Sequence, residues 1–99
     1  MRYVLLVIRS FKCRETAKIY GGDFSRRLPH DVQPIMRRKL RMIELAINIE
    51  DLRVPPGNRL EALKGSREGQ YSIRVNEQFR VCFRWSNGGA EDVEMIDYH

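Results

Sequence analysis

The chain has 99 residues and a net charge of +5 at neutral pH, which fits one domain with one core and requires no cross-link to hold it. Residues 1–50 carry 11 basic and 5 acidic side chains and residues 51–99 carry 7 and 8, so the first half favours a polyanionic partner. Cys13 and Cys82 lack CxxC spacing and nearby histidines, which argues against a zinc site or a disulfide framework. We expect two reduced thiols, with a bridge between them left as an alternative.

The first predicted element is a strand over residues 3–11, which are rich in Val, Ile and aromatic side chains. Its apolar run, residues 3–8, ends at Arg9 and is too short for a membrane span and poor as a signal peptide. We therefore expect a cytoplasmic protein without a membrane partner. A short helix over residues 15–20 follows, closed by Gly21-Gly22.

The strongest helical pattern follows Asp31, a good N-cap residue, with Pro34 tolerated in the first turn. Apolar residues recur at the helical period: Met36, Leu40, Ile43 and Ile47. The opposite side carries Arg37, Arg41, Glu44 and Asn48. Its arginines form either a solvated helix face or an anion-binding surface.

A turn-rich connection over residues 51–58, including Pro55-Pro56-Gly57, separates this helical half from a sheet half. Residues 71–75 and 79–85 alternate apolar and polar side chains and predict a hairpin closed by residues 76–78. Asn87-Gly88-Gly89 supplies another turn before a last strand over residues 93–98. The predicted fold class is α+β, with an N-terminal strand and two helices packed on one face of a mainly antiparallel sheet of four to five strands.

The predicted hairpin register places Arg74 directly opposite Arg80, with Arg84 farther along the same face. Like charges facing each other across a sheet repel, unless carboxylates or a bound anion lie between them. Arginine suits phosphate because it is a planar and permanently charged donor. Two interpretations stay open: the face binds phosphate, or Glu61, Glu68 or the acidic last strand pairs with its arginines.

The histidines and the acidic residues bear on which chemistry is available. Cleaving RNA takes a base for the 2′-hydroxyl, an acid for the leaving 5′-oxygen and positive charge at phosphorus, and none of these needs a metal. No cluster of Asp, Glu and His has metal-ligand spacing, so we expect neither a metal nor another cofactor. His30, beside Pro29, is read as a loop residue, whereas His99 follows Tyr98 at the last position and is a better candidate.

Several segments resemble one known family in their order and spacing. They are Ile8-Arg9-Ser10-Phe11-Lys12, Asn58-Arg59-Leu60-Glu61-Ala62-Leu63-Lys64-Gly65, Gly69-Gln70-Tyr71-Ser72-Ile73-Arg74-Val75, Phe79-Arg80-Val81-Cys82-Phe83-Arg84-Trp85 and Asp97-Tyr98-His99. Together they look like the HigB toxins of the RelE superfamily. The resemblance implies a RelE-like single domain, residues 1–99, that enters the ribosomal decoding site and cuts messenger RNA. It also implies a HigA-like helix-turn-helix antitoxin as a partner. The toxin would contact operator DNA only through this antitoxin.

Carried over by position, the resemblance implies an active site of Lys64, Arg80, Tyr98 and His99. Lys64 and His99 would share proton transfer and charge stabilisation, Arg80 would hold the scissile phosphate, and Tyr98 would orient RNA or assist the proton step. The basic residues Arg74, Arg84, Arg37 and Arg41 are candidates for RNA binding. Glu61 lies where some relatives have a histidine, so it either acts as a base itself or takes no part in the chemistry.

Relatives commonly begin just before the Ser-Phe pair, which predicts that residues 1–6 are a dispensable extension. Two alternative functions remain. One is a toxin of the same fold that poisons gyrase without cutting RNA, against which the retained site residues argue. The other is a non-catalytic RNA-binding module, in which arginine substitutions would weaken binding in a salt-dependent way.

Overall fold

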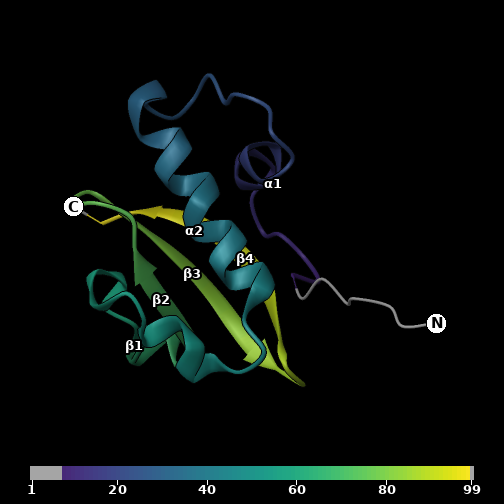
Figure 1. The fold of residues 1–99 in the computed structure, drawn as a ribbon, viewed down its shortest axis with the longest axis vertical. Coiled ribbons are helices and arrows are strands. Elements are labelled where there is room, and N and C mark those ends of the chain that lie inside the picture. Colours follow the sequence, from purple (N-terminus) through teal and green to yellow (C-terminus); the bar gives the residue numbers. More distant parts are fainter. Residues whose placement is uncertain (1–7, 99) are drawn as a thin grey trace.

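The computed structural model describes residues 8–98, which form a helical layer packed on one sheet (Figure 1). Helices α1 (Arg14–Tyr20) and α2 (Gln33–Leu45) precede the sheet in the chain. The strands are β1 (Glu61–Ala62), β2 (Gln70–Arg74), β3 (Phe79–Ser86) and β4 (Gly89–Asp97). They pair antiparallel in the order β1-β2-β3-β4. The predicted α+β class, with both helices on a mainly antiparallel sheet, is confirmed.

Four short 3-10 helices connect these elements in the described part of the chain: η1 (His30–Val32), η2 (Ile49–Arg53), η3 (Pro56–Asn58) and η4 (Gly65–Arg67). The second and third of them lie in the connection that the sequence predicts to be turn-rich.

Helix α1 ends where the sequence predicts. Gly21 caps it, and Gly22 follows with φ of +98°, a backbone conformation that glycine adopts without steric cost. The Thr16 hydroxyl oxygen accepts a hydrogen bond from the Met95 backbone N–H at 2.9 Å. This bond fixes α1 against β4.

Helix α2 presents the predicted apolar stripe to the sheet, with Met36, Leu40 and Ile43 fully buried. The prediction for Ile47 was wrong: its side chain is 80% exposed. Helix α2 ends at Leu45, and Ala46 adopts an extended conformation, so Ile47 no longer follows the helical phase.

Two further details of this helix differ from the prediction. Asp31 is not its N-cap, because the 3-10 turn η1 runs directly into α2 and Val32 takes that position. Glu44 does not lie on a solvated side, since its carboxylate accepts hydrogen bonds from the Tyr20 hydroxyl at 2.9 Å and from Arg41 at 3.2 Å. Helix α1 covers that side of α2 and buries Glu44.

The predicted first strand lies partly outside the described residues, and the proposed extension, residues 1–6, lies wholly outside them. Its described part forms isolated parallel bridges, Ile8 to Ala90 and Phe11 to Val93, and not a continuous strand. These bridges still place the segment along β4. The last strand begins at Gly89, four residues earlier than predicted, directly after a turn in which Asn87 and Gly88 have positive φ.

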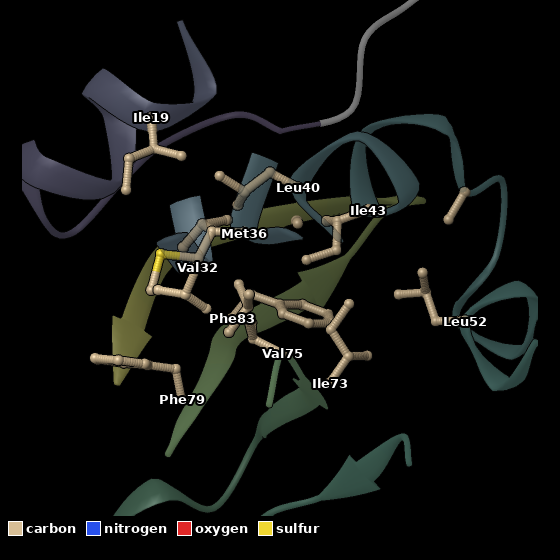
Figure 2. Close-up of a cluster of buried hydrophobic side chains, with 14 residues drawn as sticks. Ile19, Val32, Met36, Leu40, Ile43, Leu52, Ile73, Val75, Phe79 and Phe83 are labelled. Carbon is tan, nitrogen blue, oxygen red and sulfur yellow. The ribbon is translucent and has the colours of Figure 1, made fainter. Parts of the chain in front are cut away.

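The core lies between the helices and one face of the sheet (Figure 2). It includes Phe83, Val81 and Ile73 from the central strands, all with no exposed surface. Since side chains alternate along a strand, their neighbours Arg80, Cys82 and Ser72 point to the other face. The packing that stabilises the fold thereby leaves one face of the sheet for polar side chains.

Candidate functional site

The hairpin of β2 and β3 has the predicted register, in which Ile73 faces Val81 and Arg74 faces Arg80. The Asn76 carboxamide oxygen accepts the backbone N–H groups of Gln78 at 2.8 Å and Phe79 at 2.7 Å. An asparagine that binds the backbone after it in this way holds a tight turn. The turn therefore helps to fix the register that places Arg80 on the face away from α2.

Arg80 is the centre of this polar face, although it is only 6% exposed. Its Nε donates to the Ser72 hydroxyl oxygen at 2.8 Å, and its Nη2 donates to the Arg59 carbonyl oxygen at 2.7 Å. The Glu61 carboxylate lies 3.3 Å from Nη2. Among the hydrogen bonds of residues 8–98, none is donated by Nη1. The guanidinium is thus fixed along one side and keeps one terminal nitrogen for another acceptor.

The Arg59 carbonyl is placed by a strained residue and a buried neighbour. Arg59 has φ of +47°, and Asn58 before it has no exposed surface. The Asn58 amide donates to the Leu52 carbonyl at 3.1 Å and accepts from the Lys39 ammonium at 2.7 Å. Burial lowers the pKa of Lys39, and the nearby cations Arg38 and Arg74 lower it further. Asn58 therefore anchors the segment that carries the Arg59 carbonyl to α2.

Tyr98 lies beside Arg80, with its ring centroid 5.4 Å from the guanidinium carbon. Its backbone N–H donates to the Gln78 carbonyl at 2.5 Å, which ties the end of β4 to the hairpin turn. The side chain is 54% exposed, so the ring contacts a cation on one side and solvent on another. His99 follows it in the sequence and lies outside the described residues.

Lys64 is exposed in the connection between β1 and β2, directly before η4 and three residues after Glu61. Its ammonium has no hydrogen-bond or ion-pair partner within residues 8–98. Of the predicted active-site residues, the structure brings Arg80 and Tyr98 into contact. Lys64 lies in the connection that follows β1, the strand that carries Glu61, the ion-pair partner of Arg80.

The other arginines of this face are largely paired with acidic side chains. Arg84 lies 3.7 Å from the Asp92 carboxylate, and Arg67 lies 3.3 Å from that of Glu94. The structure therefore shows the carboxylate pairing that the sequence left open for Arg80 and Arg84, while phosphate binding stays a prediction. Cys82 lies beneath this network, and burial raises the pKa of its thiol. Both cysteines are free thiols, as expected.

Arg37 and Arg41 lie elsewhere. Arg37 donates to the Ile19 carbonyl at 2.9 Å, and the Arg41 guanidinium stacks over the Tyr20 ring at 5.8 Å. Both contacts join α2 to α1, on the helical side of the sheet. The structure does not bring these two arginines together with Arg80.

Neither of the two groups that hold Arg80 directly, the Ser72 hydroxyl and the Arg59 carbonyl, was predicted from the sequence. Ser72 carries a usable signal, because it alternates with Tyr71 and Ile73 and must share a face with Arg80 once the register is known. The Arg59 carbonyl has no such signal, because a backbone group in a left-handed conformation leaves no mark in the side-chain pattern.

No group of three or more His, Cys, Asp or Glu side chains within residues 8–98 is arranged to hold a metal ion. Separately, none of the helices in this part of the chain is long and apolar enough to cross a membrane.

Comparison with known proteins gives the class of molecule. Residues 9–99 match the family model of the RelE-like toxin HigB of type II toxin-antitoxin systems. Toxin HigB-1 of Vibrio cholerae serotype O1 is 42% identical over 81 residues, which cover 81% of this chain and 85% of that protein. Endoribonuclease HigB of Proteus vulgaris is 31% identical over 97 residues, covering 94% of this chain and 100% of that protein. An uncharacterized protein of Haemophilus influenzae is 42% identical over 78 residues, covering 79% of this chain and 76% of that protein.

The fold and these matches define a RelE-like toxin of a type II toxin-antitoxin system. Within that class, the chain belongs to the HigB-like toxin family. Membership implies an antitoxin as its partner.

Proposed function

We propose that this chain is a ribosome-dependent endoribonuclease that cleaves translated messenger RNA and so inhibits translation. The name of the Proteus vulgaris relative, an endoribonuclease, supports the reaction class. The observation that carries the proposal is the arrangement of Arg80: a guanidinium held by Ser72 and the Arg59 carbonyl, beside the exposed Tyr98 ring, with Nη1 not used by residues 8–98.

This arrangement suits a phosphodiester in two ways. A preoriented guanidinium can donate to the equatorial oxygens of the phosphate as their charge grows in the transition state, without first reorganising. An exposed aromatic ring next to it can stack on a base, an interaction worth roughly 1–3 kcal/mol per base. Arg80 would therefore hold the scissile phosphate while Tyr98 orients the adjoining nucleotide.

The proton transfers are assigned to the remaining family positions. Lys64 and His99 would share the removal of the 2′-hydroxyl proton, the protonation of the leaving 5′-oxygen and the stabilisation of charge. These side chains supply general acid and base groups and positive charge, so the proposed reaction requires no metal. Messenger RNA bound in the ribosomal decoding site would be the substrate.

The partners and the compartment follow from this reaction. A HigA-like helix-turn-helix antitoxin would inhibit the toxin and bind operator DNA for the pair, and the cytoplasm, where ribosomes work, would be its location. Arg74 and Arg84 lie on the same face as Arg80 and would extend the contact with the RNA backbone.

The first test is brief induction of the intact chain in growing cells, with mapping of new messenger-RNA 5′ ends. We expect growth arrest with cuts inside translated codons, both lost in a Lys64→Ala, His99→Ala double variant. Lys18→Ala is the matched control, because Lys18 lies on α1 and pairs with Glu15 at 3.9 Å. It should arrest growth as the unchanged chain does.

Two results would count against the nuclease. Arrest without new 5′ ends would indicate a toxin that acts without cutting RNA. Equal potency of the double variant would remove Lys64 and His99 from the chemistry.

A further inference from the structure

We propose that Glu61 is an exchangeable counterion of Arg80. In the free protein the Glu61 carboxylate occupies the phosphate site, and the phosphate of the substrate displaces it. This inference rests on the proposed function, because it concerns the site at which RNA would bind. It gives Glu61 a role in binding and assigns it no proton transfer.

The contacts of Arg80 are of two kinds. To the Ser72 hydroxyl oxygen and the Arg59 carbonyl oxygen, both neutral acceptors, the guanidinium donates hydrogen bonds of 2.8 and 2.7 Å. The contact with Glu61 is longer, 3.3 Å, and is an ion pair without hydrogen-bond geometry. The neutral acceptors therefore set the position of the guanidinium, and Glu61 supplies mainly charge.

Arg80 and Glu61 also differ in exposure. The Arg80 side chain is 7% exposed and the Glu61 side chain is 52% exposed. A guanidinium does not lose its proton at any ordinary pH, so a nearly buried one needs an anion close by. Glu61 meets this need from the solvent side, where a phosphate group would also approach.

Glu61 stands on an element that can release it. Strand β1 contains two residues, Glu61 and Ala62, and lies at the edge of the sheet, paired only to β2 among the described strands. An exposed carboxylate on a short edge strand turns into solvent at little cost, because side-chain rotation breaks no backbone hydrogen bond. A phosphate can then take its place while Arg80 stays where Ser72 and Arg59 hold it.

The sign of one substitution separates this role from catalysis. If Glu61 competes with phosphate, Glu61→Gln removes the competing charge and tightens phosphate binding, by about threefold or more for an ion pair that is half exposed. If Glu61 is a general base, the same substitution leaves phosphate binding nearly unchanged and abolishes turnover.

The experiment titrates inorganic phosphate into the purified full chain and follows the side-chain resonances of Arg80 by NMR. Glu61→Gln should bind phosphate about threefold or more tightly than the unchanged protein. Glu68→Gln is the control, since it removes one exposed carboxylate from the connection that follows β1 and Glu68 has no ion-pair partner within residues 8–98. Its affinity should match that of the unchanged protein.

A second measurement uses the unchanged protein and does not depend on a folded variant. The Glu61 carboxyl carbon should shift along the titration with the same midpoint as the Arg80 resonances, because the two events are one exchange. Weaker or equal binding by Glu61→Gln, a Glu61 signal that stays still, or no response of Arg80 to phosphate would each overturn the proposal. None of these readouts uses RNA cleavage, so failure of the nuclease proposal would be recognised separately, by the absence of new messenger-RNA ends.

Discussion

Asn58 is a buried amide whose oxygen and nitrogen both have partners. It accepts from the Lys39 ammonium and donates to the Leu52 carbonyl. Asn58→Ala would leave a buried cation and a buried carbonyl without those partners, each a costly loss. We expect the free energy of unfolding to fall by about 2–3 kcal/mol, measured by urea denaturation at neutral pH.

A double-mutant cycle checks the cause. When Lys39→Ala is already present, the cation that Asn58 serves is gone, so Asn58→Ala should cost less than it does alone. Equal costs in the two backgrounds would mean that the Lys39 contact contributes nothing and that the effect comes from the loop alone.

Single residues of the site differ in how far the sequence predicts them. Strand alternation and the hairpin register place Arg74 opposite Arg80, and both are confirmed. The ion pair of Arg80 with Glu61 is one of two outcomes that the sequence left open. The left-handed conformation of Arg59, a residue type that rarely adopts it, was beyond prediction because it depends on the anchoring of Asn58 against α2.

Side-chain hydrogen bonds hold the part of the α1–α2 connection that precedes η1. The Gln33 amide accepts from the Ser25 backbone N–H at 2.9 Å and donates to the carbonyls of Ser25 at 2.8 Å and Leu28 at 2.9 Å. The Ser25 hydroxyl donates to the Glu15 carboxylate at 2.5 Å. Both Gln33 and Ser25 are fully buried, so this connection is joined to the two helices that it links.

The Ser25 hydrogen bond makes this element sensitive to acid. It lowers the pKa of Glu15, with Lys18, Arg27 and Arg14 adding to the effect. A carboxyl whose pKa is lower in the folded state stabilises the protein fully above its ordinary pKa and loses that contribution as the pH falls through the lowered value. At neutral pH the Glu15→Gln variant should therefore unfold at a lower urea concentration than the unchanged protein.

The pH series is the decisive part of this measurement. The difference between the unchanged protein and Glu15→Gln should shrink as the pH falls below the ordinary range of a carboxyl, and should vanish in strong acid. A difference that is the same at every pH would mean that the substitution acts through packing.

Elements with strong local patterns were predicted well, and those that depend on tertiary contacts were not. The hairpin of β2 and β3 follows from alternation and a three-residue turn, and α2 follows from its apolar period. Strand β1 was missed because two residues carry no periodic signal. The early start of β4 was missed because Gly89 and Ala90, poor strand formers, extend as strand only by pairing with β3.

The stability of the whole molecule should be greatest at the centre of the sheet. Strand β3 pairs with neighbours on both sides, and Val81 and Phe83 on it have no exposed surface. Strand β1 is at the edge and has two residues. Amide hydrogen exchange should therefore be slowest in β3, at the rate of global unfolding, and much faster in β1 through local opening.

This order of exchange connects the fold with the site. Arg80 would lie on β3, the strand whose amides exchange most slowly, and Glu61 on β1, whose amides exchange much faster. The guanidinium would therefore be rigid, while the carboxylate that pairs with it would move. Protection of β1 equal to that of β3 would contradict this view of the sheet, since β1 would then open only with the whole domain.

Asn58 and Arg59 are neighbours in the chain, and one of them anchors the fold while the other holds Arg80. For a toxin this adjacency has a genetic consequence. A selection for cells that survive induction collects every allele that disarms the protein, whether or not the altered residue would touch RNA. Substitutions of Asn58 and Ser72 should recur among the survivors as often as substitutions of Arg80 do. The positions of the inactivating substitutions would therefore identify the residues that hold the guanidinium as well as Arg80 itself.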